Sequence, residues 1–167
     1  MAISMYQASI PQMKKMLTNL SHLLKKGEAY AAAKNVDGSV LTSYRLFPDM
    51  LPLTKQVQIA CDQVKNGMAR LVGIESPKFD DHETTFDQLQ ERIAKTIAFV
   101  DTIKPHQVDG TEAKEIKFSI KEWKFEFVGE QYLLTWIMPN FYFHITTAYN
   151  ILRHNGVEIG KSDFLGG

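Results

Sequence analysis

Four stretches of this 167-residue sequence carry apolar residues at spacings of three and four, and this repeat constrains the fold more than any other feature. Such spacing places the apolar side chains on one stripe of an α-helix, because about 3.6 residues complete each turn. The predicted helices cover residues 6–26, 53–72, 86–103 and 130–154. Amphipathic helices of similar length bury their stripes against one another. We therefore expect a mainly α protein, a four-helix bundle forming a single domain over residues 1–167.

Local signals predict where these helices end. Gly27 follows two lysines and predicts the end of the first helix, with a short separate helix over residues 28–34. Gly73 closes the second helix, and Thr85 with Gln88 forms a capping box before the third. The apolar faces of the first two helices consist of Met13, Met16, Leu17, Leu20, Leu23 and Leu24, and of Val57, Cys61, Val64, Met68 and Leu71.

The sequence changes its period before the last helix. Between residues 115 and 128 apolar and polar residues alternate, which is typical of β-strands, and Lys121-Glu122 lies near the middle. We expect a short β-hairpin there. The last helix is apolar or aromatic almost all round, so it should be the most buried of the four, with a kink at Pro139. Residues 157–167 are expected to be irregular.

Charge and composition exclude several classes of function. Basic and acidic residues both number 19, so the net charge is zero and no basic excess marks a nucleic-acid-binding face. Near-zero net charge favours self-association. No apolar run approaches the roughly 20 residues that span a membrane, and the N-terminus lacks a signal-peptide pattern. The single cysteine, Cys61, fits a small core residue and suits a reducing compartment, so we expect a cytoplasmic protein.

The strongest candidate site lies on the last helix. Asn140 and His144 are four residues apart and therefore share a face, which Thr147 continues. Two ligands at this spacing can hold one metal ion, but asparagine is a poor ligand for transition metals. Three interpretations remain open for His144: a hydrogen-bonded core residue, a ligand-binding or catalytic residue, and a metal ligand.

The second helix and its entrance offer further polar residues. Asp49 precedes the helix and can either cap it or enter a pocket. Gln58 and Asp62 are four residues apart and share one side of the helix, which faces either the bundle axis or water. We predict Asp49 as a catalytic partner of His144, and Asn140, Gln58, Asp62 and Thr147 as ligand-binding residues.

Five motifs together resemble a bacterial domain-of-unknown-function family in the DinB/YfiT-like superfamily. They are Phe47-Pro-Asp-Met50, Gln56-Val-Gln-Ile-Ala-Cys-Asp62, Glu83-Thr-Thr-Phe86, Pro139-Asn-Phe-Tyr-Phe-His144 and Thr146-Thr-Ala-Tyr-Asn-Ile-Leu-Arg-His-Asn-Gly156. The likeness covers essentially the whole chain. It implies a DinB-like four-helix bundle that is often a homodimer.

The resemblance also implies a metal site that this sequence does not reproduce. Many superfamily members hold zinc or nickel on one histidine of the second helix and a His-x-x-x-His pair of the last, and some are transferases or isomerases that use mycothiol, bacillithiol or glutathione. Here Asn140 stands at the first position of the pair, and only His144 matches the second. The second helix offers Gln56 or Gln58 but no histidine. We therefore predict no metal ligands and leave the cofactor unassigned.

The sequence supports three hypotheses about function. The leading one is a DinB-like protein that binds a small molecule in a polar pocket at His144 and Asn140, without the three-histidine metal site. The second is an enzyme resembling the thiol-dependent transferases, with His144 as general base or metal ligand. The third is a non-catalytic dimerisation or stress-response module.

Overall fold

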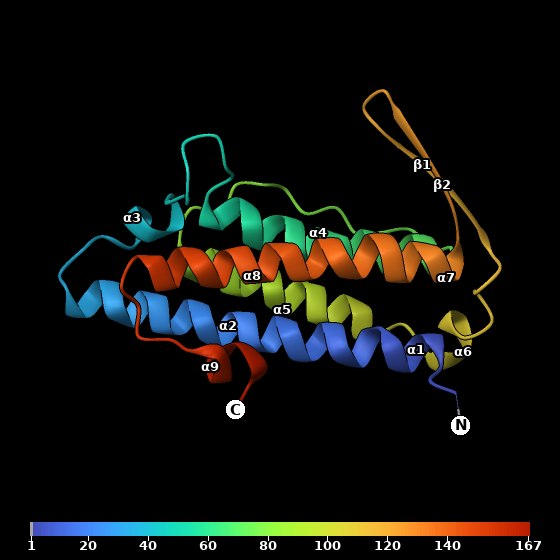
Figure 1. Ribbon diagram of the computed structural model, residues 1–167, viewed down its shortest axis with the longest axis horizontal. Coiled ribbons are helices and arrows are strands. Elements are labelled where there is room, and N and C mark those ends of the chain that lie inside the picture. Colours follow the sequence, from blue (N-terminus) through green and yellow to red (C-terminus); the bar gives the residue numbers. More distant parts are fainter. Residues whose placement is uncertain (1) are drawn as a thin grey trace.

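Four long helices build the molecule in this computed structural model, which describes residues 2–167. They are α2 (Ile10–Ala33), α4 (Leu53–Val72), α5 (Phe86–Asp101) and α8 (Met138–His154). Each long helix packs against two others: α4 contacts α8 and α5, and α2 contacts the same two helices from the opposite side. Figure 1 shows α4 and α8 side by side over α2 and α5. The predicted four-helix bundle is confirmed.

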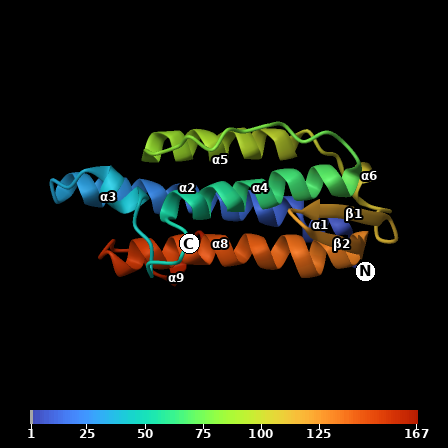
Figure 2. The same cartoon turned by 90° about the horizontal axis from the view of Figure 1, so that it is seen from above.

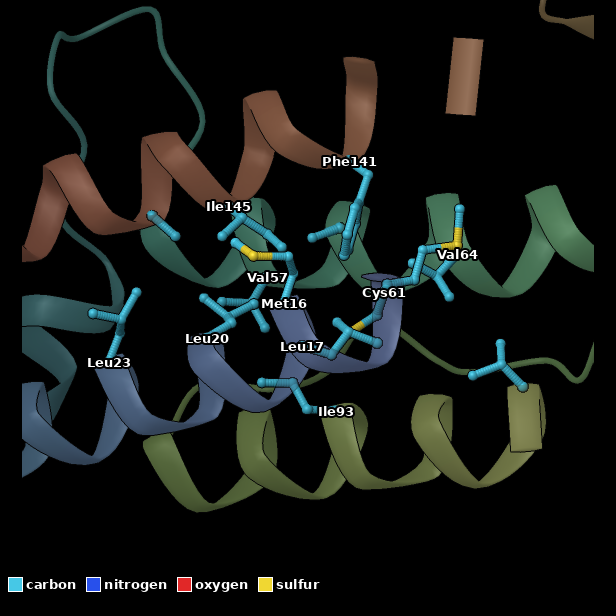
Figure 3. Close-up of a cluster of buried hydrophobic side chains, with 14 of the residues drawn as sticks. Met16, Leu17, Leu20, Leu23, Val57, Cys61, Val64, Ile93, Phe141 and Ile145 are labelled. Carbon is cyan, nitrogen blue, oxygen red and sulfur yellow. The ribbon is translucent and has the colours of Figure 1, made fainter. Parts of the chain in front are cut away.

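The core lies along the axis between these four helices. Figure 3 shows Leu17 and Leu20 of α2 meeting Val57 of α4, Ile93 of α5 and Ile145 of α8. All five side chains are buried, and so is Cys61. Each large aliphatic side chain removed from water in this way contributes about 1.5–3 kcal/mol to folding. The predicted apolar stripes of α2 and α4 therefore form this core.

Two predicted helix boundaries are confirmed by their capping residues. Gly73 follows α4 with a φ angle of +81°, a left-handed conformation that glycine adopts without strain. The Thr85 side chain accepts a hydrogen bond from the Gln88 amide, and the Gln88 side chain reaches back to the amide of Thr85. Both halves of the predicted capping box are formed.

The prediction that Gly27 ends the first helix is wrong. Helix α2 continues through it to Ala33, and the preceding turn, α1 (Met5–Ala8), is separated from α2 at Ser9. A Cβ atom at Gly27 would lie 2.8 Å from a methyl carbon of Leu152 and 3.3 Å from the ring of Phe86. Gly27 therefore allows α2 to approach α8 and the start of α5 closely, and its role is in packing.

Three further short helices flank the bundle, namely α3 (Gly38–Thr42), α6 (Pro105–Val108) and α9 (Lys161–Leu165). The expectation of an irregular tail is wrong because α9 packs on the outside of α2, as Figure 1 shows. The Asn19 side chain donates a hydrogen bond to the carbonyl of Phe164 at 2.9 Å, and Lys26 pairs with Asp163 at 2.5 Å. These contacts hold the tail on α2.

The predicted hairpin is present, with β1 (Glu115–Ile120) antiparallel to β2 (Trp123–Val128). Ile120 pairs with Trp123, so Lys121 and Glu122 form a two-residue turn in which Lys121 has a φ angle of +52°. Figures 1 and 2 show the hairpin projecting from the α4–α8 side of the bundle. Its base is held by aromatic contacts between Phe118, Phe125 and Phe127 of the strands and Tyr132 and Trp136 of the next helical segment.

The predicted last helix consists of three consecutive segments: α7 (Gly129–Gln131), the π-helical turn η1 (Tyr132–Ile137) and α8. In η1 the amide of Met138 donates to the carbonyl of Leu133, five residues earlier. This wider turn lies immediately before Pro139, which has no amide hydrogen to give.

The expectation that the last helix would be the most buried is wrong. Phe143 is 59% exposed and Leu134 is 50% exposed, because one side of α8 and η1 faces away from the bundle. Helix α4 buries more of its side chains. Among residues 2–167 no helix has the length and apolar character that crossing a bilayer requires.

Candidate functional site

His144 is hydrogen-bonded across the α4–α8 interface. Its Nδ1 lies 2.7 Å from Oε1 of Gln56, and Gln56 is 2% exposed. The imidazole itself is half-buried, beside the exposed ring of Phe143. Of the two glutamines that the sequence offered as partners from the second helix, Gln56 is the one that reaches His144.

A chain of hydrogen bonds fixes the tautomer of His144. The Gln56 amide nitrogen donates to the carbonyl of Leu51 at 3.0 Å, so its carbonyl oxygen faces the imidazole. A carbonyl oxygen can only accept, and Nδ1 of His144 must therefore carry the hydrogen. In the neutral ring the other nitrogen, Nε2, then keeps a lone pair. No residue in the described part of the chain donates a hydrogen bond to Nε2.

Burial lowers the pKa of His144 below its ordinary value, because the charged imidazolium loses hydration there. The ring is therefore neutral at pH 7, with the lone pair of Nε2 retained. Such a nitrogen can accept a hydrogen bond, take up a proton or coordinate a metal ion. The chemistry open to this residue is that of a base or an acceptor.

The other candidates on α8 bond to their own helix. The Asn140 amide donates to the carbonyl of Trp136, and the Thr147 hydroxyl donates to the carbonyl of Phe143, each at 2.7 Å. Thr147 is buried with its only proton engaged. Asn140 is half-buried one turn before His144, and its carbonyl oxygen accepts no hydrogen bond within residues 2–167.

Gln58 and Asp62 lie at a second place, between α4 and α5. Gln58 donates to Glu83 at 2.7 Å, and Arg92 donates to Asp62 at 2.9 Å. The structure thus brings His144 together with Gln56, whereas Gln58 and Asp62 bond to Glu83 and Arg92 instead. Asp49 is exposed on the connection before α4 and makes no hydrogen bond or ion pair with His144.

Arg92 is the centre of a buried ionic cluster that the sequence reasoning missed. Its side chain is 1% exposed and pairs with Glu83 at 2.9 Å, Asp81 at 3.0 Å and Asp62 at 2.9 Å. The residues between Gly73 and Thr85, here called the strap, supply two of these carboxylates. The available signal was position: Arg92 falls on the same stripe as the apolar residues Leu89, Ile93 and Val100.

The contacts of this cluster lower the pKa of Glu83. Burial would raise the pKa of Glu83, but the hydrogen bonds from Arg92 and Gln58 outweigh this effect and hold the pKa below its ordinary value. A polar cavity of about 190 Å³ lies beside Arg92 and Glu83 under the strap. One buried atom of Gln58, Oε1, and one of Arg92, Nε, have no hydrogen-bond partner within the described residues.

Cys61 belongs to the core and to neither site. It is fully buried, and this burial raises the pKa of its thiol to about 12. The thiolate, which is the nucleophilic form, is therefore suppressed at neutral pH. The prediction that Cys61 is a small core residue is therefore confirmed.

The donor set at Gln56, Asn140 and His144 does not fit zinc or nickel. It offers a single imidazole and two amide oxygens, whereas these metals favour several imidazole or thiolate ligands. The Gln56 oxygen is also occupied by His144. Within the described residues, 2–167, no three histidine, cysteine, aspartate or glutamate side chains gather in a way that could hold a metal ion.

Comparisons with known proteins identify a family and a similar solved structure for nearly the whole chain. A family model described as "Domain of unknown function (DUF1993)" matches residues 5–165. The crystal structure of a DinB family member protein from Shewanella denitrificans matches with a TM-score of 0.89 and 44% identity, covering 97% of this chain and 92% of that chain. Among curated proteins, no relative matches. This chain therefore belongs to the DUF1993 family, and its four-helix bundle is that of a DinB family protein.

Proposed function

We propose that this protein binds a small polar molecule at His144 and Asn140, in the cytoplasm and without a metal triad. The observation that carries the proposal is the hydrogen-bond chain from His144 through Gln56 to Leu51. It fixes the imidazole as an acceptor at Nε2, and the Asn140 carbonyl oxygen adds a second acceptor one turn away. A ligand with hydroxyl, amide or thiol hydrogens complements this pair.

An enzymatic role is the second candidate, supported by the same nitrogen. A neutral imidazole whose pKa is lowered by burial can take a proton from a bound thiol and so act as a general base. Asp62 is held by Arg92 on the other side of α4. His144 would therefore act without a carboxylate partner from that helix.

Nitrogen NMR of histidine-labelled protein tests the ligand site directly. We expect His144 to show the tautomer with hydrogen on Nδ1, and we expect its Nε2 resonance to move saturably during titration with glutathione or with small alcohols, amides and thiols. The His154→Ala variant, altered on the exposed end of the same helix, is the matched control and should behave like the wild type. The absence of a saturable response of this resonance to every probe contradicts the proposal, and so does a probe affinity, measured by calorimetry, that is unchanged in His144→Ala.

We further propose that the protein is a homodimer formed through the α4–α8 side. Large apolar side chains are exposed there on three elements: Phe47 (63%) on the connection before α4, Trp123 (66%) on the hairpin and Phe143 (59%) on α8. Figure 1 shows this connection and the hairpin rising from the same side of the bundle near opposite ends. A two-fold axis between these two ends would place the connection of one protomer against the hairpin of its partner, and the reverse. This arrangement is a self-complementary interface.

Sedimentation velocity tests the dimer. The double variant Trp123→Ser/Phe143→Ser should sediment as a monomer at concentrations where the wild type is dimeric. Leu165→Ser is the matched control, because Leu165 is 51% exposed but belongs to α9 on the α2 side. A wild type that remains monomeric over the accessible concentration range, or a control that dissociates equally, counts against the interface.

A further inference from the structure

The cavity beneath the strap lies between this segment and α5, apart from the His144 site. Its volume is about 190 Å³, and its lining includes the buried side chains of Arg92 and Glu83. The half-buried ring of Phe79 adds an apolar surface. The cations of Lys65 and Arg92 lie 4.9 Å and 5.7 Å from the centre of this ring and hold it in place. The cavity therefore joins an apolar wall to buried polar groups.

Two hydrogen-bond donors of this lining have no acceptor within residues 2–167. One is Nε of Arg92. The other is the side-chain nitrogen of Gln88, because only the oxygen of this side chain is engaged, by the backbone amides of Thr84 and Thr85. A buried donor without an acceptor is unfavourable. A ligand oxygen would satisfy these donors, and it reaches the covered Nε once the surrounding side chains rearrange.

The charges around the cavity are of both signs. Four of the charged side chains form two ion pairs, Arg92–Glu83 and Lys95–Glu91. Lys78 and Asp80 of the strap also line the cavity, and neither makes an ion pair within the described chain. A lone anion would face the Asp80 carboxylate uncompensated, and a lone cation would face the Lys78 ammonium. One ligand with both charges complements the two.

The volume restricts the ligand to a small molecule, since pockets for drug-sized ligands measure roughly 300–1,000 Å³. We propose that the cavity under the strap binds a small zwitterion, a free amino acid with a short side chain. Its carboxylate accepts hydrogen bonds from Lys78 and Gln88, and its ammonium group lies toward Asp80. Its carbon atoms pack on Phe79. This site shares no residue with the ligand site proposed at His144.

Hydrogen exchange of the strap tests the proposal. The probes are glycine, alanine, serine, proline and γ-aminobutyrate, with acetate and methylammonium as the single-charge controls. We expect at least one zwitterion to slow amide exchange across residues 74–84 saturably, by about tenfold when its concentration is ten times Kd, and to raise the thermal midpoint. Acetate and methylammonium should leave both measurements unchanged.

The Gln88→Glu variant separates binding from folding. Glutamate at this position still completes the capping box with Thr85, but it donates no hydrogen bond and adds a negative charge to the cavity. We expect it to weaken binding of the zwitterion by about tenfold or more. Lys78→Met, on the exposed part of the strap, should weaken binding similarly. Its matched control is Lys124→Met on the hairpin, which should bind like the wild type.

Each outcome decides the proposal. It is overturned when no zwitterion slows exchange in the strap, when acetate or methylammonium acts equally well, or when Lys78→Met keeps the wild-type affinity. The Lys78 variant decides alone where Gln88→Glu destabilises α5. His144→Ala should retain the effect on the strap, because this residue belongs to the other site. Loss of the effect in His144→Ala would assign the ligand to that site and reject this one.

Discussion

The protonation of His144 links one residue to the stability of the whole chain. Its pKa is lowered by burial, so the unfolded chain takes up this proton at a higher pH than the folded chain does. Stability is therefore fully present above the ordinary histidine pKa of about 6.5 and declines as the pH falls toward the lowered value. The imidazole favours folding only while it is neutral.

We expect the urea midpoint of the wild type to fall between pH 7 and about 5.5, and the His144→Gln variant to lose much less over this range. Glutamine can still donate to Gln56 but does not titrate. His154→Gln, on the exposed end of α8, should behave like the wild type. Equal pH dependence in the wild type and His144→Gln would show that the lowered pKa has no energetic consequence.

The choice between Gln56 and Gln58 shows where prediction from sequence stops at this scale. The spacing of Asn140 and His144 predicts that both side chains share one face of the last helix. The two glutamines flank the core residue Val57 on opposite sides, one toward α8 and the other toward the strap and α5. Which neighbour occupies which side depends on the order of helices around the bundle, and apolar periodicity does not contain that information.

At the scale of elements, the Arg92 guanidinium is the centre of the contacts that hold the strap over α4 and α5. Arg92 pairs with the carboxylates of Asp81 and Glu83 and donates to the carbonyl of Asp80. Lys65 adds a hydrogen bond to the carbonyl of Pro77 at 2.7 Å. Because Glu83 has a lowered pKa, its contribution to stability is present above the ordinary glutamate pKa and is lost as the pH falls through the lowered value.

Replacing Arg92 with methionine should release the strap. Removing one partner of a buried ion pair lowers the free energy of unfolding by about 3–5 kcal/mol. Here Glu83 would stay buried without its cationic partner. Hydrogen exchange should become faster across residues 74–84, and the urea midpoint should fall. Adding Glu83→Gln to Arg92→Met should recover part of this loss. An Arg92→Met protein with wild-type exchange in the strap would show that backbone packing, and not the cluster, holds this segment.

Among the elements, those defined by local chemistry were predictable and those defined by distant contacts were not. Helix α4 and the Thr85–Gln88 capping box are determined by signals within a few residues. Gly27 predicts a helix end by the same local rules, yet it lies inside α2 because Leu152 and Phe86 need the space. Arg92 likewise has the character of a surface residue until the strap brings its carboxylates.

At the scale of the whole molecule, the hairpin is an attachment to the bundle. Its strands pair only with each other within the described chain, and it is held at its base by Phe118, which contacts Tyr132 and Trp136 and lies 4.3 Å from the Arg70 guanidinium. An isolated two-stranded hairpin is marginally stable in water. Its order therefore depends on these aromatic contacts.

Phe118→Ala should disorder the hairpin while the bundle stays folded. We expect the free energy of local unfolding of the hairpin to fall by roughly 2 kcal/mol, less than for a fully buried phenylalanine, with near-complete loss of amide protection over residues 115–128. Helical circular dichroism should be unchanged. If the bundle melts together with the hairpin in one transition well below the wild-type midpoint, the two are a single cooperative unit and this description fails.

The π-helical turn at Tyr132–Ile137 has a consequence for comparing this helix with others. A turn of this kind holds one residue more than an α-helical turn, so it absorbs an insertion without displacing the residues beyond it. Loss of one residue here would restore ordinary winding and leave His144 facing α4, whereas the same loss beyond Ile137 would swing the imidazole about 100° around the axis. Residue counting across this stretch is therefore unsafe, and alignment of the histidine should begin from Pro139.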